Sequence, residues 1–183
     1  IDLADDFPMY LAMAANDIST VYAAGGSSSG DPVVFKTANA GAGWTNTFHT
    51  ANNQNIATGW SGQGGDRGWS YGEIALGLGV APNDSAKVVF TDLGFVHRTS
   101  DGGANWQQAY VSPADQHPAG TTAIAKKSYH SVGLENTSCW QMVWSDAQNV
   151  FAAFSDIKGA RSTDGGVTWS FNYTGHDANT MYR

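Results

Sequence analysis

The chain has 183 residues, a formal net charge of −7 and few charged residues (14%), whereas glycine (22 residues) and aromatic side chains (12%) are plentiful. This composition is typical of short strands, tight turns and aromatic packing, and it argues against a helical protein. The acidic balance without lysine or arginine clusters argues against a nucleic-acid partner, and the lack of an 18-residue apolar run predicts that no helix spans a membrane.

The predicted elements are short strands joined by turns and by three longer loops. Inner strands are expected within residues 3–24, and a loop rich in glycine and serine is expected at 25–32. Residues 49–72 predict a long loop that leads into a strand at 74–80, and residues 111–129 predict another long connection. Because no stretch of 12 or more residues has clean helical periodicity, the chain is expected to be all-β.

A nine-residue motif occurs near the end of each of three similar segments. It reads Arg-Ser-Thr-Asp-Gly-Gly-Val-Thr-Trp at residues 161–169 and Arg-Thr-Ser-Asp-Gly-Gly-Ala-Asn-Trp at 98–106. A degenerate copy, with Asn39 in place of the aspartate, lies at 36–44. The motif tryptophans are spaced by 106 − 44 = 62 and 169 − 106 = 63 residues. A fixed period of this length indicates a repeat architecture.

The motif has the chemistry of a turn. An aspartate side chain can accept backbone N–H groups, glycine takes a positive φ without steric cost, and tryptophan is large enough to pin the turn against its sheet. We therefore predict structural rather than catalytic roles for the motif residues. In the two intact copies these residues are Asp101, Gly103, Trp106, Asp164, Gly166 and Trp169.

Both intact copies resemble the Asp-box (Ser/Thr-x-Asp-x-Gly-x-x-Trp) of sialidases, sortilin-type receptors and xyloglucanase-type hydrolases, and we refer to the three copies as boxes. The resemblance implies an Asp-box β-propeller in which each box lies between the outer strands of a blade. It places three four-stranded blades at about residues 3–48, 60–110 and 129–174 of a single partial propeller spanning 1–183. Closed propellers usually have about 4–8 blades, so the remaining blades are expected on missing sequence or on another chain.

Four further segments resemble the xyloglucanase-type hydrolases of glycoside hydrolase family 74. Residues 64–69 and 88–94 are similar to the family's phrase around the general base. Residues 133–137 and 151–159 are similar to its phrases around the general acid.

These segments imply a catalytic pair, with Asp92 as general base and Asp156 as general acid. Inverting hydrolysis of a glycoside needs two carboxyl groups about 6.5–9.5 Å apart, with room for a water molecule. The segments depart from the family pattern at Phe95, Asn136 and Lys158. The two aspartates are 156 − 92 = 64 residues apart, about one repeat, so the alternative is one structural position that recurs in neighbouring blades without catalysis.

Substrate-binding residues are expected in an exposed loop at 59–71. Large apolar side chains beside a glycine-rich loop either pack or offer faces on which sugar rings stack, and nearby charged groups can hydrogen-bond to hydroxyls. The binding residues predicted on this basis, with one from the segment 133–137, are Trp60, Asp66, Arg67, Trp69 and Glu135. By contrast, we interpret Trp140 and Trp144 as core residues on a strand face.

Two functions stay open. The first is a secreted polysaccharide-directed glycoside hydrolase, and the alternative is a non-catalytic surface propeller that binds carbohydrate or protein. No cofactor and no metal centre are expected, because the five histidines are scattered without ligand spacing. The resemblance implies a secreted or cell-surface protein, and the first residue, Ile1, indicates processing or truncation.

Overall fold

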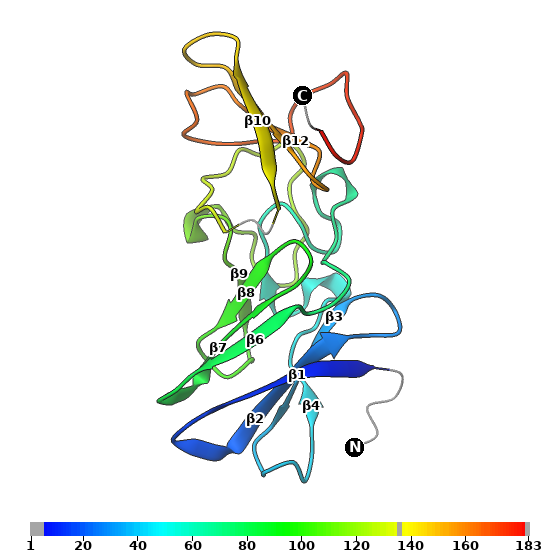
Figure 1. Cartoon of the computed structure of the whole chain (residues 1–183), viewed down its shortest axis with the longest axis vertical. Coiled ribbons are helices and arrows are strands. Elements are labelled where there is room, and N and C mark those ends of the chain that lie inside the picture. Colours follow the sequence, from blue (N-terminus) through cyan, green and yellow to red (C-terminus); the bar gives the residue numbers. More distant parts are fainter. Residues whose placement is uncertain (1–5, 135–136, 182–183) are drawn as a thin grey trace.

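The chain folds into three mainly antiparallel sheets that follow one another in sequence (Figure 1). The computed structural model describes residues 6–134 and 137–181. The strands of the first sheet, in spatial order, are β1 (Phe7–Ala14), β2 (Asp17–Gly26), β3 (Pro32–Thr37) and β4 (Thr45–Asn46). Because Gly25 and Gly26 still belong to β2, the loop expected at 25–32 is shorter than predicted.

The second sheet has five strands in the order β5-β9-β8-β7-β6. Four of them pair in antiparallel fashion, namely β6 (Gly77–Ala81), β7 (Asp84–Thr91), β8 (Val96–Thr99) and β9 (Trp106–Gln108). The short strand β5 (Ile56–Ala57) adds to β9 in parallel. The strand expected at 74–80 is β6, which begins at Gly77.

The third sheet contains β10 (Cys139–Trp144), β11 (Val150–Phe154) and β12 (Gly159–Ser162). Its fourth position is a single bridge between Arg161 and Ser170 rather than a strand. The helical elements of the described residues are the short 3-10 turns η1 (Ala51–Asn53), η2 (Asp66–Gly68) and η3 (Pro113–Asp115). None of these turns is long enough to cross a bilayer.

The strand pairing shows that the three sheets share one register. In each sheet a valine of the second strand pairs with the hydroxyl residue of the box. These pairs are Val21–Thr37, Val88–Thr99 and Val150–Ser162. Since side chains alternate across a strand, residues at equivalent positions lie on equivalent faces of their sheets.

The register defines two faces in each sheet. We call the face that carries the box tryptophan the tryptophan face; in the first sheet it includes Ala23, Phe35 and Trp44. We call the opposite face the basic face, because it carries the basic residue that opens each box. These basic residues are Lys36, Arg98 and Arg161.

The basic face of the first sheet packs against the tryptophan face of the second. Their shared core includes Tyr22, Ala24 and Val34 from the first sheet and Val88, Phe90 and Trp106 from the second. Polar contacts fix the packing: Lys36 Nζ donates to the Gly102 carbonyl at 3.0 Å, and the Tyr22 hydroxyl donates to the Ser85 carbonyl at 2.8 Å.

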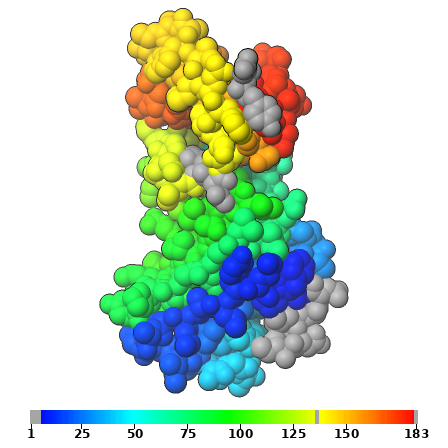
Figure 2. Space-filling view, viewed as in Figure 1, coloured from blue at the N-terminus to red at the C-terminus, as the bar shows by residue number. Residues whose placement is uncertain are grey.

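The third sheet is attached differently, through loops. A second cluster of buried, mostly aromatic side chains joins the β7–β8 and β11–β12 hairpins to the long loops between the sheets. Its members are Trp60, Phe95, Tyr110, Val111, Tyr129, Ile157 and Phe171. As a result, the third sheet forms the end of the elongated molecule opposite to the first sheet (Figure 1, Figure 2).

Candidate functional site

The aspartates of the intact boxes cap their own turns. Asp164 Oδ1 accepts hydrogen bonds from Ser162 Oγ at 2.7 Å and from the Thr168 N–H at 2.9 Å, while Oδ2 accepts the Thr168 hydroxyl at 2.6 Å. These bonds, led by that of the Thr168 side chain, lower the pKa of Asp164 to about 2. Asp101 is bound by the corresponding residues of its own box, Thr99 and Asn105.

The second glycine of each intact box takes the left-handed backbone that favours glycine. The φ angle is 88° at Gly103 and 92° at Gly166. Their N–H groups donate to the hydroxyls of Thr99 and Ser162, at 3.1 and 2.8 Å. The box residues therefore bond one another within the turn that they form.

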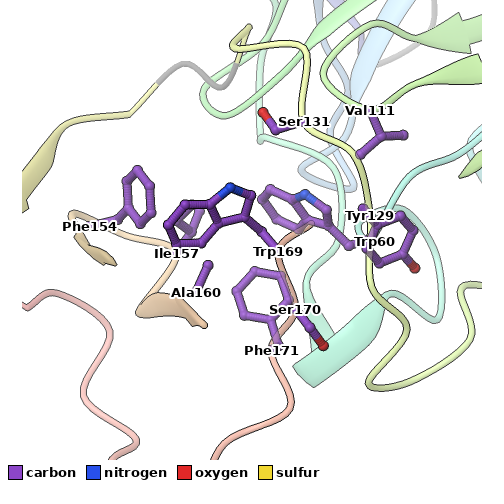
Figure 3. Close-up of a pocket in the computed structure, with 10 residues that line it drawn as sticks. All are labelled: Trp60, Val111, Tyr129, Ser131, Phe154, Ile157, Ala160, Trp169, Ser170 and Phe171. Atoms are coloured by element: carbon purple, nitrogen blue, oxygen red, sulfur yellow. The ribbon is translucent and has the colours of Figure 1, made fainter. Parts of the chain in front are cut away.

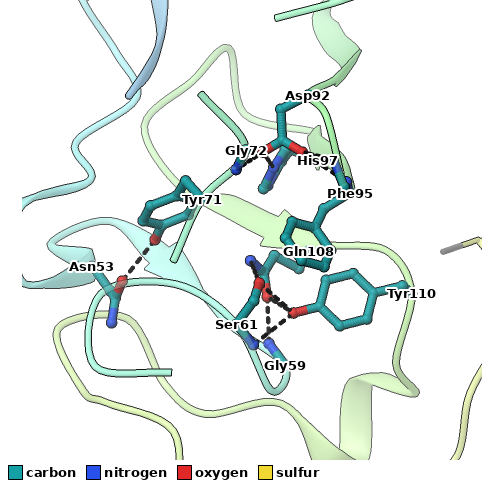
Figure 4. Close-up of polar contacts among 11 residues, drawn as sticks. Asn53, Gly59, Ser61, Tyr71, Gly72, Asp92, Phe95, His97, Gln108 and Tyr110 are labelled. Atoms are coloured by element: carbon teal, nitrogen blue, oxygen red, sulfur yellow. Dashed lines mark hydrogen bonds and ion pairs between the residues drawn. The ribbon is translucent and has the colours of Figure 1, made fainter. Parts of the chain in front are cut away.

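Asp92 lies in the turn between β7 and β8, and its side chain is fully buried (Figure 4). Oδ1 accepts the N–H groups of Gly94 and Phe95, at 2.9 and 2.7 Å. Oδ2 accepts the N–H of Gly72 at 3.2 Å and lies 2.8 Å from His97 Nε2. Asp92 therefore fixes its hairpin and ties it to the segment before β6, where its carboxylate has no access to solvent.

Asp156 lies in the corresponding turn of the third sheet, between β11 and β12, and is exposed. Its backbone has a φ of 62°, and Lys158 in the same turn has a φ of 68°. The N–H of Asp156 donates to Thr180 Oγ1 at 3.2 Å. One aspartate is thus a buried anchor and the other a surface residue, in corresponding turns of two separate sheets. Because a buried carboxylate that already accepts several hydrogen bonds is poorly placed to activate water, this geometry argues against an acid–base pair. The two aspartates do not share one recurring position either, because the common register of the sheets places Phe154, not Asp156, at the position of Asp92.

The loop at 59–71 has exposed residues, but the side chains predicted to bind substrate are buried or half-buried, so the expectation that they lie exposed is wrong. Only 6% of Trp60 is exposed, because its ring packs edge-on against Tyr110 and Phe171 at centroid distances of 4.9 and 5.0 Å. Trp69 is partly buried against the same cluster. These indoles join the second and third sheets instead of offering an open face to a sugar.

Asp66 and Arg67, both predicted to bind substrate, hold neighbouring loops. Asp66 is 4% exposed, and its Oδ2 accepts the N–H of Lys126 at 2.7 Å. Arg67 Nη2 donates to the carbonyls of Phe171 and Tyr173, at 3.0 and 2.6 Å, and the guanidinium lies 3.9 Å from the centre of the Tyr173 ring. Arg67 therefore fastens the segment after the third box to the loop before β6.

The indoles that are exposed belong to β10, which corrects our interpretation of Trp140 and Trp144 as core residues. They are 55% and 53% exposed, and Met142 and Val143 between them are exposed to a similar degree. Glu135, also predicted to bind substrate, lies outside the described residues.

A buried polar network, which the sequence analysis missed, joins β9 to the loop after β5 (Figure 4). Gln108 Oε1 accepts the N–H of Gly59 at 2.6 Å and the hydroxyl of Tyr110, and its amide nitrogen donates to Ser61 Oγ at 2.9 Å. A long loop that is buried must find partners for its backbone, and here the side chains supply them.

Asn53 performs the same role between the two long loops. Its Nδ2 donates to the carbonyls of Gln63 and Thr121 at 2.9 and 2.8 Å. Its Oδ1 accepts the Gln63 N–H at 2.8 Å and the Tyr71 hydroxyl at 2.7 Å. The amide richness of these loops was the available sequence signal, since buried polar groups need partners of this kind.

An apolar cavity of about 90 Å³ opens between the second cluster and the third sheet (Figure 3). Much of its wall is formed by Trp60, Tyr129, Phe154, Ala160, Trp169 and Phe171. The polar tips of two of these residues are bonded elsewhere: Trp169 Nε1 donates to the Gly166 carbonyl at 3.1 Å, and the Tyr129 hydroxyl lies 2.9 Å from His117 Nε2. The cavity therefore presents mainly carbon surfaces.

The part of the chain that the structure describes builds no candidate metal centre. Within it, no group of three or more histidine, cysteine, aspartate or glutamate side chains is placed to hold an ion.

The three consecutive sheets define an all-β protein, and their arrangement is consistent with a partial β-propeller. No family model matches the chain, and no curated protein matches it significantly. Solved structures that are similar to this chain at low identity include two enzymes of family GH74 and the protein YCF48.

An ancestral GH74 enzyme matches 97% of this chain with 16% identity and a TM-score of 0.41, and the GH74 enzyme of Niastella koreensis matches 87% with 16% identity and a TM-score of 0.36. YCF48 bound to D1 peptide matches 94% with 13% identity and a TM-score of 0.37. The chain spans 19% and 21% of the length of the two GH74 enzymes and 70% of that of YCF48. Likeness at this level concerns the fold alone.

Proposed function

We propose that the chain is a non-catalytic propeller module that binds a polypeptide, with an apolar side chain of the partner seated in the cavity of Figure 3. The cavity carries this proposal. Its volume of about 90 Å³ and its aromatic walls suit one small apolar group. Transfer of such a group out of water contributes about 25 cal/mol for each Å² that is buried.

The chemistry of the wall disfavours a sugar at this place. A sugar ring carries hydroxyls that would lose water on entry, and each unpaired group would cost about 1–3 kcal/mol. Trp169 and Tyr129 already use their polar tips, so they offer only their ring surfaces. An apolar side chain loses no hydrogen bonds on entering.

The buried state of Asp92 supports the non-catalytic part of the proposal. The predicted general base would have to contact a water molecule beside the substrate, whereas Asp92 is inaccessible and bonded to its own hairpin. This leaves Asp156 as the accessible member of the predicted pair.

Peptide selection tests the proposal. Peptides from a random display library are selected on the wild-type chain, and their affinity is then measured for two variants. Ala160→Leu fills the cavity from its wall, and the control Ala104→Leu changes an exposed alanine in the second box. We expect selected peptides to contain a required apolar residue. Ala160→Leu should weaken their binding about tenfold or more, a change of ~1.4 kcal/mol, and Ala104→Leu should leave it unchanged.

Two results would argue against this function. One is a selection in which no peptide depends on Ala160. The other is hydrolysis of xyloglucan or a β-glucan by the wild-type chain that is lost in Asp156→Asn.

Carbohydrate binding is a second candidate, favoured by the two exposed indoles on β10. Trp140 Nε1 donates to Ser155 Oγ at 2.6 Å, which holds this indole beside the turn that carries Asp156. Exposed tryptophan faces suit sugar rings, and the carboxylate could accept hydroxyls. Affinity electrophoresis in gels containing plant polysaccharides tests this candidate: retardation of the wild-type chain that is lost in Trp140→Ala and Trp144→Ala would favour it over the peptide function.

A further inference from the structure

In the packed pair of sheets, the tryptophan face of the second sheet is covered by the basic face of the first. On the second sheet, Leu78 and Val80 of β6 pack against the core that this sheet shares with the basic face of the first. Both residues lie opposite core residues of β7, since Leu78 pairs with Phe90 and Val80 with Val88.

The first sheet has apolar residues at the same two positions without such a cover. Leu11 pairs with Ala23 and Met13 with Val21, so they correspond to Leu78 and Val80 of the second sheet. Leu11 is nevertheless 72% exposed and Met13 52% exposed. The strand that carries them, β1, is the dark blue part of the molecular surface in Figure 2.

The basic face of the second sheet is also open. A hollow of about 650 Å³ lies over it, lined by Gly79, Val89 and Arg98 among others. Val89, which lines the hollow from β7, is 45% exposed. The corresponding face of the first sheet is covered by the second sheet. The hollow therefore lies where a neighbouring sheet would pack.

The two open faces carry residues that correspond to the contact residues of the packed pair. In the packed pair, Lys36 on the basic face of the first sheet donates to the carbonyl of Gly102, which belongs to the second box. Arg98 occupies the position of Lys36 on the second sheet, and the carbonyl of Ala40 occupies the position of Gly102 in the first box. An anchoring hydrogen bond of the same kind is therefore available between the two open faces.

The apolar part of the contact is complementary as well. Tyr22 meets Ser85 in the packed pair, through a hydrogen bond from its hydroxyl. At the corresponding positions of the open faces stand Val89 and Ile18, and Ile18 is 74% exposed. The hydroxyl of Tyr22 thus has the apolar side chain of Val89 in its place, and the apolar side chain of Ile18 stands opposite it.

We propose that the basic face of the second sheet docks onto the tryptophan face of the first sheet of a second copy of this chain. The contact continues the packing already present between the two sheets within one copy. It is heterologous, because the two copies use different faces, and it can therefore extend into a ring or an open array. The chain's own third sheet is held elsewhere, by the second cluster and by the bonds of Arg67 to Phe171 and Tyr173.

Mixing of two blocked variants tests this interface. Leu11→Glu blocks the tryptophan face of the first sheet, and Val89→Glu blocks the basic face of the second; both residues are exposed, so thermal unfolding should confirm that the variants stay folded. By multi-angle light scattering, the wild-type chain should grow in mass with concentration. Each variant alone should be monomeric, and an equimolar mixture should form a complex of two chains and no larger species.

Two further variants separate this interface from others. Val167→Glu, at an exposed residue of the third box, should associate like the wild type. Val143→Glu blocks the basic face of the third sheet, and it too should leave association unchanged. A wild-type chain that stays monomeric at all concentrations would overturn the proposal. So would association that survives Val89→Glu or is abolished by Val143→Glu.

Discussion

At the scale of single residues, the three boxes differ in how well their turns are satisfied. Asp164 uses both carboxylate oxygens, whereas Asn39 has one acceptor oxygen, which binds the Thr37 hydroxyl and the Gly43 N–H. The first box also places Ala40, with a φ of 54°, where the other boxes have a glycine. The degenerate box therefore keeps the geometry of the turn at a higher conformational cost.

The backbone of Ala40 gives a prediction about stability. Left-handed backbone costs a residue with a Cβ atom about 1–2 kcal/mol relative to glycine. Ala40→Gly should therefore raise the free energy of unfolding by about 1 kcal/mol, measured by urea denaturation. The matched change Gly165→Ala, at a φ of 74° and with no atom closer than 3.5 Å to the new Cβ, should lower it by a similar amount. Destabilisation by Ala40→Gly would contradict this account of the first box.

The lowered pKa of Asp164 predicts a pH dependence. Since the folded state holds the carboxylate at a pKa of about 2, below the ordinary value of 3.8, it favours the ionised form. The resulting stabilisation is fully present above the unfolded pKa and is lost as the pH falls from about 4 toward 2. The melting temperature of Asp164→Asn should therefore fall less steeply than that of the wild type over this interval. Parallel melting curves against pH for the two proteins would show that Asp164 contributes nothing there.

At the scale of the elements, the β7–β8 and β11–β12 hairpins have the same place in their sheets but different supports. The first is anchored from within by Asp92, which accepts three backbone N–H groups and contacts His97. The second is held by its neighbours: Ile157 at its tip belongs to the second cluster, while Asp156 is exposed. The turn between the second and third strands is therefore held by a buried carboxylate in one sheet and by apolar packing in the other.

This difference predicts unequal effects of the two aspartates on stability. Asp92→Ala leaves several buried donors without a partner, each at a cost of about 1–3 kcal/mol, so the free energy of unfolding should fall by about 3 kcal/mol or more. Asp156→Asn keeps a residue type that tolerates the left-handed backbone of this position, so it should change the free energy of unfolding by less than about 0.5 kcal/mol, as is usual for an exposed residue. Chemical denaturation of both variants measures this. Equal effects would mean that the two turns are supported alike.

The boxes and most strands could be predicted because their signals are local. The turn chemistry around Asp101 and Asp164 lies within nine residues, and the strands follow from short apolar runs between polar turns. The burial of Trp60 and the exposure of Trp144 could not be predicted, because each depends on which sheet or loop lies opposite. The same holds for Asp92, whose surroundings include Gly72 from a distant segment.

At the scale of the whole molecule, the box tryptophans of three similar repeats lie in different environments. Trp106 is 1% exposed and donates its indole N–H to the carbonyl of Thr47, which directly follows β4 of the neighbouring sheet, whereas Trp44 and Trp169 are only partly buried. The middle repeat is covered by the first, and the third is set apart by the loops. This separation creates the cavity on which the proposed binding function rests.

The measurement that tests this account most directly is the binding of xenon to the cavity in crystals of the chain. Xenon enters dry apolar cavities, whereas a polar site of this size holds ordered water. We predict a xenon peak between Trp60, Trp169 and Phe171 in the wild-type chain and none in Ala160→Leu. Ordered water in the cavity, or a wild-type structure without xenon there, would contradict the claim that these residues form an apolar binding site.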